Sequence, residues 1–414
     1  MLNGDTKLLS STNQAYGSTA TIPEAIKEFK AGRPVIIVDD LDRENEGDLA
    51  IAAEMVTPEW VAFMAKEGGG LVCIACVASR LDELQIEPMV DRNTSRFGTA
   101  FSVSVEARHL VTTGISAHDR AATIRHILDP LAKPSDFAKP GHTFPLRAAE
   151  GGVLMRAGQT EAAVDLARMA GLYPAGVICE VMNDDGTMAR MTDLETFARK
   201  YRLKIVAIKD LIAYRRRSEK QVRCMAMTVI PNRYGKWRTF AYEDILRKES
   251  HLAVVLGEID AETPTLVRVH SECLTGDVFG SFCCDCGEQL DRAMQLIAEH
   301  GSGVVLYIRH HEGRGIGLVD KIRAYSMQDA GMDTIEANEA IGLPADGREY
   351  GIGSQILYDL GIRKMRILTN NPRKYFGVAD MGLEVVEQVP IRILSNPYNE
   401  RYLKTKRDRM GHLL

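Results

Sequence analysis

The stretch TIPEAIKEFKAGRPVIIV, residues 21–38, contains the pattern that decides the fold class. Thr21 followed three residues later by Glu24 is a capping box, which predicts the start of a helix. Apolar residues then repeat at the spacing of one helical face until Gly32, which is placed to end the helix. A continuous apolar run at 34–38 follows and predicts a buried strand.

The same order of elements recurs along the first half of the chain. Helical patterns begin at Thr57 and at Thr160, and the first of these ends at Gly68. Short apolar runs such as LVCIACV (71–77) and IVAIKDL (205–211) lie between the helical patterns. This alternation predicts an α/β or α+β fold and excludes a helix bundle or a β-sandwich.

A second domain follows a charged interruption. The segment YRRRSEKQVR (214–223) has no apolar period, although the end of a helix running into a surface loop would look the same. Strand-like and helical patterns then resume. We predict two mixed α/β domains of similar size, with a loose tail at 1–19, a first domain at 20–214, a linker at 215–223 and a second domain at 224–414.

Composition supports two domains and limits the functional classes. A chain of 414 residues exceeds the roughly 250–300 residues of a single core. The net charge of −5 and 6% aromatic residues argue against a zinc-stapled nucleic-acid-binding module. Eight cysteines, no apparent signal peptide and no membrane-length apolar run predict a cytoplasmic enzyme without nucleic-acid or membrane partners.

Cysteines cluster in HSECLTGDVFGSFCCDCG (270–287). In an extended chain, Cys284 and Cys286 face the same way and Cys283 faces away, and Cys273 must return across a loop to join them. Three thiolates with a vacant fourth position are typical of a catalytic zinc, which activates water near neutral pH. The alternative is that Cys283 closes the site and the zinc is structural.

Two turns that carry cationic residues, the first of them also rich in glycine, follow predicted strands in the same half. HEGRG (311–315) follows VVLYI, and TNNPRK (369–374) follows MRIL. Backbone amides and cations at the ends of strands suit phosphate groups, although each turn alone could be an ordinary solvated loop. Together with the cysteines they predict a polyanionic substrate that carries a base.

The motifs HSECLTGD, CDCG, HEGRGIGL, DTIEAN and LTNNPRK, in this order, resemble the GTP cyclohydrolase II family from about residue 224 to the C-terminus. The resemblance implies Zn2+ on Cys273, Cys284 and Cys286. It implies GTP binding by Arg268, Val269, His270, Ser271, Glu272, Gln289, Glu312, Gly313, Arg314, Thr334, Thr369 and Lys374.

The same resemblance implies catalytic roles for two further residues. Asp346 accepts a proton, and Arg348 is assigned as the nucleophile that releases pyrophosphate. A guanidinium stays protonated to about pH 12, so stabilisation of phosphate charge is an equally good interpretation of Arg348. One departure is Cys283, which stands where the family usually has arginine.

An acidic segment, DDLDRENEGD (39–48), directly follows the first predicted strand. Crowded carboxylates suit Mg2+, whereas the alternative is a solvated acidic loop that binds no metal. The later segment RAGQT (156–160) opens a helix, whose N-terminus is a natural phosphate cradle. His142 and Glu180 are candidate acid/base groups.

With RNTSRFGTAFSVSVEA, TTGISAHDRA, KPGHTFPLRA and VMNDDGTMAR, these segments resemble the 3,4-dihydroxy-2-butanone 4-phosphate synthase family over residues 20–214. The family converts ribulose 5-phosphate with loss of formate. The resemblance implies substrate binding by Arg43, Glu44, Asp48, Arg156, Ala157, Gly158, Gln159, Thr160 and Glu180, and Mg2+ or Mn2+ on Glu44 and a partner at position 159.

Position 159 departs from the synthase motif R-x-G-H-T, because Gln159 replaces the metal-ligating histidine. Glutamine offers one neutral oxygen and cannot titrate near neutral pH. We therefore weigh two hypotheses. The chain is a bifunctional riboflavin biosynthesis enzyme with a weakened synthase, or only the cyclohydrolase is active and the first half is structural. The resemblance also implies a homodimer.

Overall fold

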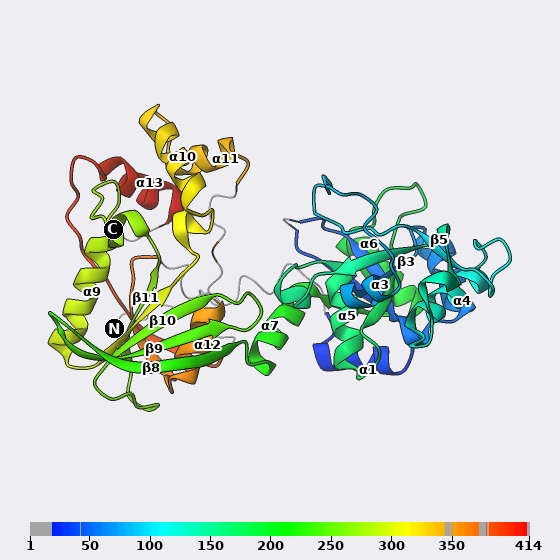
Figure 1. Cartoon of the computed structure of the whole chain (residues 1–414), viewed down its shortest axis with the longest axis horizontal. Coiled ribbons are helices and arrows are strands. Elements are labelled where there is room, and N and C mark those ends of the chain that lie inside the picture. The colour runs from blue at the N-terminus through cyan, green and yellow to red at the C-terminus, as the bar shows by residue number, and fades with distance from the viewer. Residues whose placement is uncertain are drawn as a thin grey trace, which may run out of the picture. The chain divides into compact units, whose positions relative to one another are not determined.

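The computed structural model describes residues 19–41, 43–343, 348, 351–371, 378 and 381–411. The chain divides into two compact units, residues 1–215 and 216–414, and each unit contains one seven-stranded sheet. Each unit is described by itself (Figure 1). Both units combine helices with one sheet that contains parallel and antiparallel pairs, so the predicted mixed α/β class is confirmed.

The first unit is built on a mixed sheet with strand order β4-β5-β3-β6-β2-β1-β7. β1 pairs parallel with β7, and β3 pairs parallel with β5. The elements are α1 (Ile22–Lys30), β1 (Val35–Val38), β2 (Gly47–Ala52), α2 (Pro58–Phe63), β3 (Cys73–Val77), α3 (Ala78–Glu83), β4 (Val105–Ala107), α4 (Ala117–Leu128), β5 (Phe137–Ala148), α5 (Gln159–Met169), β6 (Ala175–Glu180), α6 (Met191–Tyr201), β7 (Lys204–Ala207) and α7 (Ile208–Ser218).

Helices cover both faces of this sheet, which explains why every residue of β1 is apolar. Ile36 and Val38 lie in a core with residues of α2, α4 and α6. Val35 and Ile37 lie in the opposite core with residues of α1, α5 and α7. The unit is therefore a three-layer sandwich, and β1, β2 and β6 lie in its interior.

The second unit has strand order β14-β13-β11-β12-β10-β9-β8, with parallel pairing around β11 and β13. The elements are β8 (Val222–Asn232), β9 (Gly235–Asp244), β10 (Ser250–Leu256), β11 (Thr265–Ser271), α8 (Leu274–Asp277), α9 (Cys286–His300), β12 (Gly303–Ile308), α10 (Leu318–Asp329), α11 (Thr334–Ala340), α12 (Gly351–Asp359), β13 (Lys364–Leu368), β14 (Glu384–Val389) and α13 (Glu400–Met410).

Helices cover the two faces of the second sheet as well. Val305 of β12 packs with Ala293 and Ile297 of α9. Val304 and Leu306, which point the other way, belong to the core that contains residues of α12. Helices α10, α11 and α13 gather beyond the sheet, near the start of α9 (Figure 1).

Local sequence signals located most elements. Helix α1 begins with the predicted capping box, in which the Thr21 backbone N–H donates to Glu24 Oε2 (2.9 Å), and Gly32 has φ +67°. The strand predicted from IVAIKDL is only partly correct, because β7 ends at Ala207 and α7 begins at Ile208. Among the described residues, no helix combines the length and apolar character needed to cross a bilayer.

The segment 215–223 differs from the aperiodic linker that its charge suggested. Helix α7 continues to Ser218, and β8 begins at Val222. The reason is that Arg215 is buried and donates to Asp165 Oδ2 (2.7 Å) and the Gly151 carbonyl (2.7 Å). The predicted tail lies almost entirely outside the described residues.

Candidate active sites

The second unit brings three thiols together at one end of its sheet. Cys273 lies just after β11, Cys284 lies in the turn before α9, and Cys286 is the first residue of α9. Their sulfur atoms all lie within 4.8 Å of one another, and Cys273 Sγ is 3.6 Å from Cys284 Sγ. Sulfurs bound tetrahedrally to one zinc ion lie about 3.8 Å apart. The three cysteines therefore fit zinc.

The backbone of residues 283–286 is not extended, contrary to the expectation from the sequence. The segment is a turn that leads into α9, and helical rather than extended backbone brings Cys286 beside Cys284. Cys283 is exposed, and its backbone N–H donates to Ser281 Oγ (3.3 Å). Among the described residues, no fourth cysteine, histidine, aspartate or glutamate joins the group.

Gly276 allows the loop after Cys273 to close over the sulfurs. A Cβ at this position would lie 3.0 Å from Cys284 Sγ and 3.2 Å from Cys273 Sγ. Such separations are closer than ordinary van der Waals contact. A residue without a side chain is thus needed here for close approach.

Lys321 of α10 connects the cysteines to the glycine-rich turn after β12. Its Nζ lies 3.1 Å from Cys273 Sγ and donates to Thr275 Oγ1 (2.8 Å) and Glu312 Oε1 (2.5 Å). The second Glu312 oxygen accepts from the Leu274 backbone N–H (2.6 Å). Burial would lower the pKa of Lys321, but the Cys273 thiolate and Glu312 outweigh it and raise that pKa.

Among the three thiols, Cys273 loses its proton most readily. Hydrogen bonds from Cys284 and Cys286 lower the pKa of Cys273, and Lys321 lowers it further. The same hydrogen bonds with Cys273 raise the pKa values of Cys284 and Cys286. A divalent cation bound by these sulfurs would displace the protons that remain on them.

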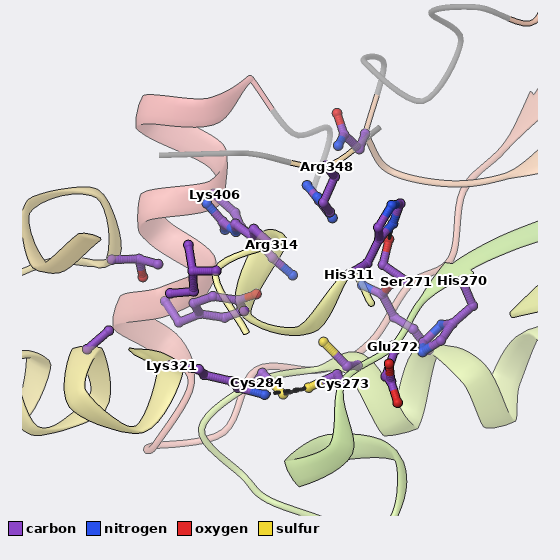
Figure 2. A pocket seen from close by; sticks show the side chains of 18 of the residues that line it. His270, Ser271, Glu272, Cys273, Cys284, His311, Arg314, Lys321, Arg348 and Lys406 are labelled. Carbon is purple, nitrogen blue, oxygen red and sulfur yellow. Dashed lines mark hydrogen bonds between the residues drawn. The ribbon is translucent and has the colours of Figure 1, made fainter. Parts of the chain in front are cut away.

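A pocket of about 980 Å³, part of it open to solvent, lies beside the cysteines (Figure 2). Cationic side chains and an apolar wall contribute to its lining. The lining includes Arg268, His270, Ser271, Glu272, Cys273, Cys284, Cys286, Gln289, His311, Gly313, Arg314, Ile316, Lys321, Ala324, Tyr325, Thr334, Arg348, Thr369, Tyr402 and Lys406.

Side chains from β11 form one rigid side of the pocket. Arg268 donates to Gln289 Oε1 (2.6 Å) and to the Leu368 carbonyl (3.0 Å). His270 Nε2 lies 3.0 Å from Asp277 Oδ1, and Asp277 Oδ2 accepts from Tyr307 (2.7 Å). These bonds hold Arg268 and His270 in place before any ligand binds.

Helix α13 forms the opposite wall. Lys406 is buried and donates to Asp285 Oδ1 (2.6 Å), the residue between Cys284 and Cys286. Burial raises the pKa of Asp285, but Lys406 and Gln289 outweigh burial and lower it. An ion pair thus anchors α13 next to the cysteines.

Most residues implied by the cyclohydrolase resemblance meet in this pocket. Exceptions are Val269, which is buried in β11, and Glu312, which bonds to Lys321. Asp346 and Lys374 lie outside the described residues. Sequence reasoning missed Lys321, Tyr325, Tyr402 and Lys406, and the only available signal was that each pair has the four-residue spacing of one helical face.

In the first unit, the acidic segment folds around Asp39. Asp39 Oδ2 accepts from the Glu44 backbone N–H (3.0 Å) and from Arg43 Nη1 (2.9 Å). Its Oδ1 accepts from the Glu46 backbone N–H (2.9 Å). Asp39 therefore binds the backbone of the residues that follow it, and Arg43 lies among the carboxylates.

The segment 156–160 meets this loop at the start of α5. Arg43 Nη1 donates to Gln159 Oε1 (2.9 Å), and Gln159 is buried. Arg156 donates to Glu161 Oε2 (2.8 Å). A Cβ on Gly158 would lie 2.7 Å from Glu161 Oε2, so glycine permits this tight turn.

The remaining candidates divide between two places. Asp48 of β2 lies opposite Glu180 of β6, and burial, followed by the charge of Glu180, raises the pKa of Asp48 well above its usual range. Glu180 Oε2 accepts from the Leu71 backbone N–H (2.8 Å). His142 instead lies 2.6 Å from Glu106 Oε1.

The residues at the implied magnesium position do not fit a divalent cation. Glu44 Oε1 lies 3.0 Å from Arg43 Nη2, and Gln159 Oε1 accepts from the same guanidinium. One oxygen of each potential ligand side chain therefore already faces a positive charge. The described residues show a group of three or more potential metal ligands only at the cysteines.

Comparison with known proteins covers both units. The family model described as 3,4-dihydroxy-2-butanone 4-phosphate synthase matches residues 23–214, and that of GTP cyclohydrolase II matches residues 223–390. The chain is 57% identical over 395 residues to the riboflavin biosynthesis protein RibBA of Aquifex aeolicus (strain VF5), covering 95% of this chain and 97% of that protein.

Two further proteins support the same assignment. RibBA of Endomicrobium trichonymphae is 53% identical over 395 residues, covering 95% of this chain and 98% of that protein. The crystal structure of RibBX, a two-domain 3,4-dihydroxy-2-butanone 4-phosphate synthase from A. baumannii, is 39% identical with a TM-score of 0.70, and the match covers 90% of this chain and 100% of that one.

Both resemblances predicted from the sequence are thus confirmed. The alternating elements, the order of the motifs and the length of the match agree. The chain belongs to the family of bifunctional riboflavin biosynthesis enzymes, with a 3,4-dihydroxy-2-butanone 4-phosphate synthase domain, a lyase, followed by a GTP cyclohydrolase II domain, a hydrolase.

Proposed function

We propose that residues 224–414 hydrolyse GTP with a zinc ion bound by Cys273, Cys284 and Cys286, with release of formate and pyrophosphate. The spacing of the three sulfur atoms carries the proposal, because it matches zinc–thiolate geometry. Zinc, when bound, supplies Lewis acidity close to the pocket.

The pocket suits a purine nucleoside triphosphate. Arg314 and Arg348 extend into the space beside the cysteines, where their charges favour phosphate oxygens (Figure 2). Ile316, Ala324 and Tyr402 provide an apolar wall for a planar base. Arg268 and Gln289 are held by their mutual hydrogen bond and present fixed polar groups to that base.

Within this proposal Arg348 stabilises phosphate charge. It lies in the pocket with Arg314 and Thr369, and a protonated guanidinium is a good phosphate clamp and a poor nucleophile. The assigned nucleophilic role of Arg348 makes a different prediction, namely a covalent guanidinium–phosphorus adduct. Asp346 as proton acceptor and Lys374 as a GTP contact remain predictions from the resemblance.

Adjacent cysteines provide the test. Cys284→Ser should lose bound zinc and GTP-dependent formate release, whereas Cys283→Ser should keep both, because Cys283 is exposed and outside the sulfur group. Zinc is measured by atomic emission on the purified full chain. Equal zinc loss in both variants would contradict the proposed ligand set.

For residues 20–214 we propose that ribulose 5-phosphate binds between the Asp39 loop and the start of α5. Arg43 meets Gln159 there, and Asp48 lies beside Glu180. Asp48 and Glu180 are candidate proton-transfer groups of this site, and His142 is retained as a further candidate. The test is calorimetric titration with ribulose 5-phosphate, in which Arg156→Met and Glu180→Gln should each weaken binding.

We also propose that the enzyme is a homodimer that works in a reducing, cytoplasmic environment. Strand β8 is an edge strand, and its exposed Met227 and Val229 point to the same side of it, a surface that a second copy would cover. All eight cysteines are free thiols. Met227→Lys should shift the mass measured by light scattering from dimer to monomer.

A further inference from the structure

Arg43 is bound on several sides by the residues that would surround a metal. Its Nη1 donates to Asp39 Oδ2 and to Gln159 Oε1, both at 2.9 Å, and its Nη2 lies 3.0 Å from Glu44 Oε1. The guanidinium also lies 5.5 Å from the Phe97 ring centroid. One fixed positive charge therefore bridges two carboxylates and the side-chain amide.

This contact fixes the orientation of the Gln159 amide. Arginine has only donors, so the amide group that faces Nη1 must be the oxygen and cannot be the NH2 group. Gln159 Nε2 then points away from Arg43, is buried, and has no hydrogen-bond partner among the described residues. The group of Gln159 left without a partner is therefore a hydrogen-bond donor, and a cation cannot accept a hydrogen bond from it.

A second unsatisfied donor lies at the same helix start. Arg156 Nε is buried without a partner among the described residues, although the rest of its guanidinium bonds to Glu161 and Thr99. Buried donors without partners are costly, and an acceptor oxygen satisfies them. Gln159 Nε2 and Arg156 Nε, the two buried donors without partners among the described residues, therefore both suit an anionic oxygen.

We infer that the synthase domain binds no divalent cation at Glu44, and that the Arg43 guanidinium, held between Asp39, Glu44 and Gln159, takes the place of the metal. Gln159 contributes a hydrogen bond to a substrate oxygen instead of a metal ligand. This inference rests on the proposed ribulose 5-phosphate site, but it is independent of the cyclohydrolase. It predicts that metal binding returns when position 159 carries an imidazole.

The probe is Mn2+ titrated into the zinc-loaded full chain and followed by electron paramagnetic resonance. Mn2+ prefers oxygen and imidazole ligands to thiolates, so it reports on the synthase domain. We expect natural protein and Glu44→Gln to leave the six-line spectrum of free Mn2+ equally undiminished. Gln159→His should bind Mn2+ roughly tenfold more tightly or better, and adding Glu44→Gln to that variant should abolish the gain.

Three results would overturn the inference. Glu44-dependent Mn2+ binding by the natural chain would show that a cation displaces Arg43. Failure of a folded Gln159→His to gain Mn2+ would show that position 159 does not control the site. Tighter binding of ribulose 5-phosphate by the natural chain when Mg2+ is added would show that substrate and metal bind together.

The comparison of natural protein with Glu44→Gln needs no histidine variant, so the inference is tested even if Gln159→His does not fold. If ribulose 5-phosphate does not bind under any condition, the proposed substrate site fails while the Mn2+ result stands. GTP hydrolysis by the same samples reports that the remainder of each variant is intact.

Discussion

Lys321 Nζ lies 3.1 Å from Cys273 Sγ, so a buried ammonium directly contacts one of the three sulfurs proposed to bind zinc. The same group bonds to Glu312, which in turn accepts from the backbone of Leu274, the residue after Cys273. Groups that bond to metal ligands orient them and adjust their basicity. In the proposed zinc site, Lys321 would therefore be a positioning residue for Cys273.

Lys321→Met should weaken zinc binding by about 10–100-fold, because Cys273 and Glu312 lose their shared donor. Transfer of zinc to a chromogenic chelator measures this loss. Arg323→Met, an exposed change on the same helix, should leave the transfer rate unchanged. If Lys321→Met retained zinc as tightly as the natural chain, the contact would be incidental.

Substitution of Gly276 should produce a graded loss of zinc. Alanine places one carbon 3.0 Å from Cys284 Sγ, which the loop absorbs by a small shift, and valine adds two further carbons. We expect zinc content to fall in the order glycine, alanine, valine. The melting temperature of the first unit, measured separately, should not change. A valine variant with full zinc content would contradict the close-approach argument.

Lys406→Met should destabilise the second unit by roughly 3–5 kcal/mol, because it leaves the Asp285 carboxylate buried without its partner. Urea unfolding provides the measurement. Lys404→Met is the matched control, since Lys404 is exposed on the same helix. Similar unfolding midpoints for the two variants would show that the ion pair does not anchor α13.

Asp48 should make stability depend on pH. Its folded-state pKa is raised by burial, then by Glu180, so its contribution is fully present below the unfolded pKa of about 3.9 and is lost as pH rises through the folded value. Asp48→Asn should therefore stabilise the first unit at pH 8, on the order of 1 kcal/mol, and less at pH 5.

Thermal unfolding at the two pH values measures the effect of Asp48. Asp184→Asn removes an exposed carboxylate and should show no such difference. A pH-independent effect of Asp48→Asn would contradict the assignment of a raised pKa.

The sequence predicted what depends on local signals. A capping box and apolar periods located α1, α2 and α5, and ordered motifs located the cysteines and most of the pocket. Tertiary burial could not be read in the same way. Arg215 looked like part of a charged linker, yet its ion pair with Asp165 extends α7.

The same limit applies to the sites. Lys321 and Lys406 look like ordinary surface lysines in the sequence, because their partners Glu312 and Asp285 are distant or unremarkable in it. At position 159 the sequence showed the departure from the motif. Only the structure showed that Arg43 donates a hydrogen bond to the side-chain oxygen of Gln159.

The ion pair between Asp285 and Lys406 spans 121 positions of the chain. At a synthesis rate of about 5–20 residues per second, a ribosome would need roughly 6–24 s to add the residues that separate them. The nascent polypeptide consequently displays the three clustered cysteines, the proposed zinc ligands, before the helix that covers them exists. Newly made enzyme thus has an interval in which zinc delivery and thiol oxidation compete for the same atoms.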